Sequence, residues 1–261
     1  SKLVSAKMAK GQFKTAYQVL KGALLFALVS GTIVAVIVFF GAGFFTKTLL
    51  STPNSIFALR VLAPALIIVA VLGVIRGFFQ GLGTMMPSAV SQIIEQVVNA
   101  IVSVWAAYVL YRVGAKTGAV LGDKEHYAAA YGAAGGTLGT NLGSVAALLF
   151  VLFVFAVYLR VFKRIMKKDR HVKVDSFAYT MKVLVITIIP VLLSTTIYNI
   201  SGIIDQGIFK KVALMQGYAN DDVEVWWGVF SGKYKLMINV PISIASAMAA
   251  SAVPTLTSSF S

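Results

Sequence analysis

The chain has 261 residues, of which 58% are hydrophobic and only 12% charged, and its formal net charge is +14. A water-soluble domain carries roughly twice that charged fraction, because charges must cover its surface. The composition therefore excludes an ordinary soluble protein, and the scatter of basic residues between apolar runs argues against nucleic-acid binding.

Six apolar runs are long enough to cross a bilayer, for which a helix needs about 20 apolar residues. They are predicted at residues 22–46, 55–80, 87–113, 128–158, 176–209 and 234–253. A polar loop is expected at 114–126 and a second loop at 210–233. A glycine-rich turn at 81–87 should place Pro87 in the first turn of the third helix. The sequence thus predicts an all-α integral membrane protein with about six transmembrane helices.

The basic residues are divided unevenly between the two predicted ends of these helices. Fourteen of the 23 Lys and Arg residues lie on the end that includes residues 1–21, Arg76 and the segment 160–182. Six of the nine acidic residues lie on the opposite end. Because cytoplasmic loops carry the excess of Lys and Arg, we expect a multi-pass protein with both ends of this chain in the cytoplasm.

Polar residues inside the third predicted helix are the first candidate site. Gln92, Glu95 and Asn99 are spaced to share one helix face, and an acidic side chain facing lipid is costly. This face is either a cavity lining that touches a polar substrate or takes up a cation or proton, or a static hydrogen-bond cluster between helices. Asp205, near the end of the fifth helix, is either a second ion-coupling candidate or an interfacial residue paired with water or Lys210.

Basic residues near the helix ends are the second candidate site. Arg76 and Lys235 lead this group, which also includes Lys21 and Lys182. Each of them is explained by a side chain that reaches toward the membrane surface. Together they are also the residue types that would give a central cavity the charge needed to bind a pyrophosphate.

Small residues in the fourth predicted helix indicate close packing between helices. Glycines recur every fourth residue in two series, and this spacing lets another helix approach closely. The two series are Gly135, Gly139 and Gly143, and Gly132 and Gly136.

No residues in the sequence support an enzymatic function. The segment 228–233 has the wrong glycine spacing for a phosphate-binding loop, and His126 and His171 lie in predicted loops without a partner spacing for a metal. The absence of cysteine excludes a disulfide framework, a thiolate metal site and a cysteine nucleophile. We therefore expect no catalytic residues, no metal site and no cofactor, and predict that the chain is not an enzyme.

The stretch from Arg76 to Asn99 resembles a known family. It reads Arg-Gly-Phe-Phe-Gln-Gly-Leu-Gly-Thr-Met-Met-Pro, followed by Ser-Ala-Val-Ser-Gln-Ile-Ile-Glu-Gln-Val-Val-Asn. It is similar to the polysaccharide-export and lipid II flippase branch of the multidrug/oligosaccharidyl-lipid/polysaccharide exporter superfamily, close to its Gram-positive stage V sporulation protein B-like group. The segments 131–139 and 199–205 support the resemblance, as do residues 239–241 and 245–254 with lower fidelity.

The resemblance implies a fourteen-helix transporter with two lobes around a central cavity, located in the bacterial plasma membrane. This chain would be an internal fragment that holds the third to eighth helices. Residues 1–170 would end the N-terminal lobe, and residues 171–261 would begin the C-terminal lobe. Lys235 approximately matches a basic residue that faces the cavity at the start of the eighth helix in lipid II flippases.

The resemblance implies a flippase that moves an undecaprenyl-pyrophosphate-linked oligosaccharide by alternating access. The cargo would be either lipid II for peptidoglycan or a polysaccharide repeat unit for the cell wall. Its partners would be this lipid-linked sugar, membrane lipids and a coupling cation or proton. Two alternatives stay open: an ion-coupled multidrug or cation antiporter of the same superfamily, with Glu95 or Asp205 as the coupling acid, and a membrane scaffold that transports nothing.

Overall fold

The computed structural model of the chain describes residues 1–49, 52, 55–167, 176–242 and 245. All regular elements of these described residues are helical. The chain divides into two compact units, Ser1–Thr196 and Ile197–Ser261. The predicted all-α class is confirmed.

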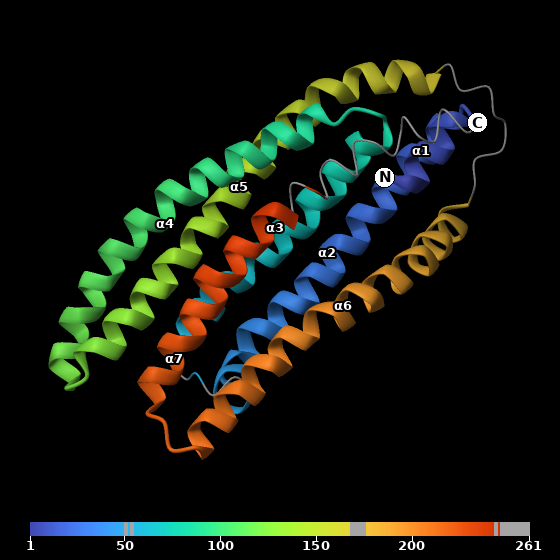
Figure 1. The fold of residues 1–261 in the computed structure, drawn as a ribbon. Helices are drawn as coiled ribbons and strands as arrows, with labels where there is room; N and C mark the ends of the chain where they lie inside the picture. Colours follow the sequence, from blue (N-terminus) through green and yellow to red (C-terminus); the bar gives the residue numbers. More distant parts are fainter. Residues whose placement is uncertain (50–51, 53–54, 168–175, 243–244, 246–261) are drawn as a thin grey trace. The chain divides into compact units, whose positions relative to one another are not determined.

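Unit 1 is built mainly from long apolar helices (Figure 1). Its elements are α1 (Lys2–Ala9), α2 (Phe13–Phe44), the π-helical segment η1 (Phe45–Leu49), α3 (Ile56–Gly81), α4 (Met86–Leu121), α5 (Lys124–Lys167) and the first part of α6 (Phe177–Met215). Helix α3 packs against both α2 and α5, while α4 and α5 lie side by side over most of the length of α4 (Figure 1).

An aromatic core joins α3 to the last turns of α5. Phe78 and Phe162 are almost completely buried, and their rings meet edge to face with centroids 5.5 Å apart. Phe155 makes the same kind of contact with Phe78 at 5.9 Å, and Tyr17 of α2 adds a tilted contact with Phe162. Such edge-to-face pairs are the favoured arrangement of aromatic rings, so this cluster fixes how α2, α3 and α5 meet.

Glycines set the separation of α4 and α5. A Cβ atom at Gly143 would lie 2.6 Å from the carbonyl oxygen of Glu95, and one at Gly139 or Gly135 would overlap the backbone of α4. A Cβ atom at Gly136 would instead meet nothing within 4 Å. The predicted packing series 135, 139 and 143 is confirmed, whereas Gly136 of the second series lies in open space.

Unit 2 contains the end of α6, then α7 (Asn220–Val229), the π-helical segment η3 (Phe230–Tyr234) and a helical stretch over residues 235–242. Lys210, in the last turns of α6, has only 4% of its surface exposed. Its ammonium lies 2.7 Å from the carboxylate of Glu224 on α7. This ion pair helps to hold α7 against α6.

Five described helical stretches are long and apolar enough to cross a membrane. They are Phe13–Thr48, Ile56–Gly81, Met86–Leu121, Lys124–Lys167 and Phe177–Met215. These five correspond to the first five predicted spans, and many large apolar side chains on them are exposed, as contact with lipid would require. The sixth predicted span is helical over 235–242, and most of its remainder lies outside the described residues.

Two predicted loops are wrong. The segment 114–126 is mostly helical, because α4 continues to Leu121 and stops only at Gly122, whose φ of 80° ends the helix. Its charged residue Lys116 is exposed on one side while Gly114 and Gly118 are buried on the other. The segment 210–233 is likewise largely helical, since α6 runs to Met215 and α7 follows after a short turn.

Candidate functional site

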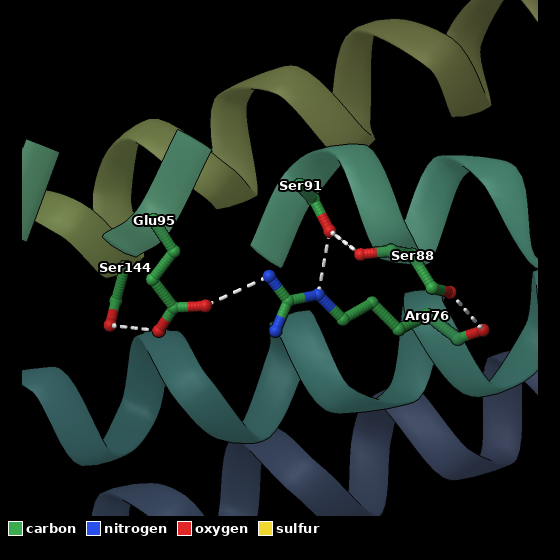
Figure 2. A network of polar contacts seen from close by, with 5 residues as sticks. All are labelled: Arg76, Ser88, Ser91, Glu95 and Ser144. Atoms are coloured by element: carbon green, nitrogen blue, oxygen red, sulfur yellow. Dashed lines mark hydrogen bonds and ion pairs between the residues drawn. The ribbon is translucent and has the colours of Figure 1, made fainter. Parts of the chain in front are cut away.

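A buried polar network joins α3, α4 and α5 (Figure 2). The Nη2 atom of Arg76 on α3 lies 2.8 Å from Oε2 of Glu95 on α4, and the Arg76 Nε atom donates to the Ser91 hydroxyl at 2.8 Å. Ser144 on α5 donates to the second Glu95 oxygen at 3.2 Å. The network therefore satisfies both carboxylate oxygens of Glu95 and two nitrogen atoms of Arg76.

The sequence positions these groups through the turn between α3 and α4. Arg76 lies five residues before Gly81, where α3 ends, and Ser91 lies five residues after Met86, where α4 begins. Antiparallel helices joined by a short turn bring such positions level with each other. Ser88, Ser91 and Glu95 follow the i, i+3, i+7 spacing of one helix face, so all three point toward Arg76 (Figure 2).

The predicted face of Gln92, Glu95 and Asn99 is divided by the structure. Asn99 continues the line of Glu95 toward α5, where the Ser103 hydroxyl lies 2.8 Å from both Asn99 Oδ1 and the carbonyl oxygen of Gly136. Gln92 is exposed and lies outside the network of Figure 2. The structure therefore brings Arg76 and Glu95 together, which the sequence analysis had placed in separate candidate sites.

The contact with Glu95 neutralises much of the positive charge of Arg76. The side chains of Arg76 and Glu95 keep only 14% and 19% of their surface exposed, so the pair is poorly screened by solvent. A guanidinium in contact with a carboxylate presents little net charge to other groups. In this arrangement Arg76 is a tether between helices rather than a free cation.

A second group of candidate residues surrounds a cavity of about 540 Å³ in unit 2. Asp205 from α6 and Lys235, the residue that follows η3, both line it. Its apolar walls are aromatic side chains, namely Phe209, Trp226, Trp227 and Phe230. The structure thus places in one aromatic cavity an acid and a base that the sequence analysis had assigned to different candidate sites.

The two histidines contribute little to a site. The ring of His126, in the first turn of α5, lies 2.8 Å from the carboxylate of Asp123, which precedes that helix. His171 lies outside the described residues. Within the part of the chain that the structure describes, no three His, Cys, Asp or Glu side chains are grouped so as to hold a metal ion.

Several residues of these sites were missed in the sequence analysis. The serines Ser88, Ser91 and Ser144 carry no charge, and only their spacing relative to Glu95 could have indicated them. Trp226 and Trp227 were placed in a loop, although two adjacent tryptophans before a glycine-containing apolar segment are a visible signal of an aromatic surface.

Comparisons with known proteins agree with the resemblance described above. Residues 1–105 match the family model MatE. A stretch of 121 residues is 29% identical to "Lipid II flippase MurJ" of Bacillus subtilis (strain 168), covering 43% of this chain and 22% of that protein. A stretch of 94 residues is 31% identical to "Stage V sporulation protein B" of the same organism, covering 36% of this chain and 18% of the relative. No solved structure matches the chain significantly.

The matched stretches span about a fifth of the length of the two curated relatives. The MatE match covers α1 to α3 and the part of α4 that carries Glu95. Members of this superfamily are transporters rather than enzymes, in agreement with the prediction. Through residues 1–105, the chain is similar to the MatE family of the multidrug/oligosaccharidyl-lipid/polysaccharide exporter superfamily.

Proposed function

We propose that the chain is part of a flippase that moves an undecaprenyl-pyrophosphate-linked oligosaccharide across the bacterial plasma membrane by alternating access. The MatE match and the similarity to a protein named as a lipid II flippase support this class of cargo. The proposal includes the two-lobe organisation expected from the sequence, with residues 1–170 in one lobe and 171–261 in the next.

The observation that carries the proposal is the position of Lys235 in the wall of the 540 Å³ cavity. A pyrophosphate is a compact polyanion, and an ammonium in a cavity wall binds it through charge-assisted hydrogen bonds. Lys235 and Asp205, both exposed, are the charged groups among the residues that line this cavity. Lys235 is therefore the substrate contact in this proposal.

Arg76 takes a different part in the proposal. A phosphate could contact its guanidinium only by displacing the carboxylate of Glu95, which lies 2.8 Å away and is also held by Ser144. We therefore assign the Arg76–Glu95 pair the task of fixing α3, α4 and α5 relative to one another. Asn99 and its neighbour Ser103 extend the same contact toward α5.

A second candidate function is a cation antiporter, which the position of Asp205 favours. A carboxylate beside four aromatic rings is an arrangement that binds organic cations. Asp205 fits a coupling site better than Glu95 does, because both oxygens of Glu95 are already engaged by Arg76 and Ser144. The positive charge of Lys235 in the same cavity opposes a cationic cargo, so we rank this function second.

The test uses the full-length parent protein in a bacterium whose own lipid II flippases can be switched off. The measured quantity is the amount of lipid II that becomes accessible at the outer surface. We expect the parent protein to restore exposure, and Lys235→Gln to reduce it at least severalfold at equal protein level in the membrane.

Lys233→Gln is the matched control, because Lys233 lies two residues earlier, is exposed and does not line the cavity. It should leave exposure unchanged. Absence of restored exposure with the parent protein in the membrane would count against lipid II as cargo. Uptake or efflux of an organic cation that depends on Asp205 would instead support the second candidate.

A further inference from the structure

We propose that the aromatic cavity of unit 2 is a binding site for a sugar phosphate, in which the tryptophan faces stack on the sugar ring and Lys235 binds the phosphate. The inference rests on the proposed function, since a phosphorylated sugar is the head group of the proposed cargo. It adds a sugar-binding role for Trp226 and Trp227, which no sequence motif or relative's name assigns.

The aromatic wall is preorganised by contacts among its own rings. Phe209 of α6 lies 5.5 Å from Trp227, measured between ring centroids, and Trp227 lies 5.5 Å from Phe230. Phe230 stacks in turn on Tyr234 at 5.6 Å, and Trp226 is braced by Tyr218 at 5.1 Å. These contacts hold the rings in place, so binding a ligand would immobilise few additional side chains.

The exposure of the rings leaves room for a ligand. Trp226 and Phe230 each have 45% of their surface exposed, and Phe209 has 36%. A cavity of about 540 Å³ falls within the usual range for small-molecule sites, which are mostly apolar with a few convergent polar groups. The flat face of a pyranose ring presents C–H groups that pack well on an indole or phenyl face.

The two charged residues decide between ligand classes. A purely cationic ligand would be repelled by Lys235, and a bare anion would be repelled by Asp205. A sugar phosphate satisfies both, because its hydroxyl groups donate to the Asp205 carboxylate while its phosphate accepts from the Lys235 ammonium. The combination of acid, base and aromatic faces therefore fits a sugar phosphate better than a drug cation or a free phosphate.

The experiment follows tryptophan emission from the full-length protein in detergent. Residues 1–261 contain three tryptophans, and Trp105 lies on α4, so Trp105→Phe leaves only the two cavity tryptophans of this chain as reporters. The probes are N-acetylglucosamine 1-phosphate, inorganic phosphate and tetraphenylphosphonium. We expect a saturable emission change with the sugar phosphate, and a response to inorganic phosphate only at about tenfold or higher concentration, because it lacks the ring.

Variants locate the response in the cavity. Trp226→Ala or Trp227→Ala, followed through the remaining tryptophan, should weaken the apparent affinity for the sugar phosphate about two- to tenfold, the range expected for one aromatic contact. Trp227→Phe should keep most of the affinity for the sugar phosphate, because a phenyl ring also stacks on a sugar. This variant replaces the alanine variants as the test if they do not fold. A Trp226→Phe/Trp227→Phe protein that keeps Trp105 should show no response.

Other outcomes overturn the inference or separate it from the proposed function. A change with tetraphenylphosphonium but not with the sugar phosphate would replace it by an organic-cation site. No change with any probe would leave the tryptophans as membrane-interface anchors only. Lipid II exposure without a sugar-phosphate response would preserve the proposed function and remove this inference. A sugar-phosphate response without lipid II exposure would preserve this inference and count against the proposed function.

Discussion

The guanidinium of Arg76 lies 2.8 Å from the carboxylate of Glu95, and the first of these residues belongs to α3 and the second to α4. Glu95 is the first acidic residue of the chain, so the 94 residues before it hold no other acid that could pair with Arg76. Inside a membrane-spanning bundle, each of these charges would be costly alone. The two residues therefore depend on each other, and Ser144 adds α5 to the contact.

Removing one partner of this pair should cost more stability than removing both. We expect Arg76→Met and Glu95→Leu to destabilise the protein singly, by an amount approaching the roughly 3–5 kcal/mol typical of a broken buried pair. The Arg76→Met/Glu95→Leu double variant should melt at a higher temperature than either single variant, because it leaves no unpaired charge. The measurement is the Tm of the purified full-length protein in detergent.

Arg60→Met is the control for loss of an arginine from the same helix. Arg60 is exposed and lies 5.8 Å from the ring centroid of Phe39, so its loss should lower Tm only slightly. Additive effects of Arg76→Met and Glu95→Leu would show that the two side chains act independently and would refute the tether.

The contact between α4 and α5 gives a second prediction. Gly139→Ala should destabilise the protein by about 1–3 kcal/mol, because its Cβ atom would overlap Ser103, including the Ser103 backbone, which cannot move away by a rotamer change. Gly136→Ala should be neutral or stabilising by up to about 1 kcal/mol, since alanine favours a helix and nothing lies near its Cβ position. Tm values of the two variants in detergent make the comparison. Equal losses would mean that helix propensity, and not close approach, governs these positions.

The ion pair of unit 2 gives a third prediction. Glu224→Gln should speed hydrogen exchange of the α7 amides about tenfold, because it removes a carboxylate 2.7 Å from the buried Lys210 ammonium and costs about 1–2 kcal/mol. Lys211→Met is the control, since Lys211 is the exposed neighbour of Lys210. Unchanged exchange in α7 after Glu224→Gln would show that aromatic contacts alone hold this helix.

The predicted orientation can be tested by labelling, because residues 1–261 contain no cysteine. In a full-length protein freed of any other cysteine, we expect Lys10→Cys and Lys163→Cys to resist a membrane-impermeant thiol reagent in intact cells and to react after permeabilisation. His126→Cys, at the turn between α4 and α5, should react in intact cells. The reverse pattern would overturn the cytoplasmic placement of the N-terminal end, which rests on the distribution of basic residues.

The apolar runs predicted the membrane helices well, because a long uncharged stretch can satisfy its backbone only as a helix. The ends of the helices were less predictable. Residues 114–121 carry Lys116 and two glycines, which together resemble a loop, yet the glycines are buried against α5 while the lysine is exposed. The composition of this segment does not distinguish a helix from a loop, because the difference depends on which helix face each residue occupies.

The candidate site was predicted in its residues but not in its pairings. Arg76 and Glu95 were both identified, yet their contact depends on how the short turn after Gly81 aligns α3 with α4, and charge alone does not reveal that register. Asp205 and Lys235 were assigned separate roles and line one cavity instead. The aromatic wall was missed because Trp226 and Trp227 were assigned to a loop that is in fact α7.

The glycine contact between α4 and α5 also constrains how these two helices can move. Where backbone touches backbone, a slide of one residue would drive a side chain such as Leu138 or Leu142 into the space that Gly139 or Gly143 leaves open. Sliding of α4 along α5 is therefore blocked, and the two helices must move together as one rigid body. A conformational change has to bend or rotate elsewhere, because the contact of Arg76 with Glu95 and Ser144 also fixes α3 to this pair of helices.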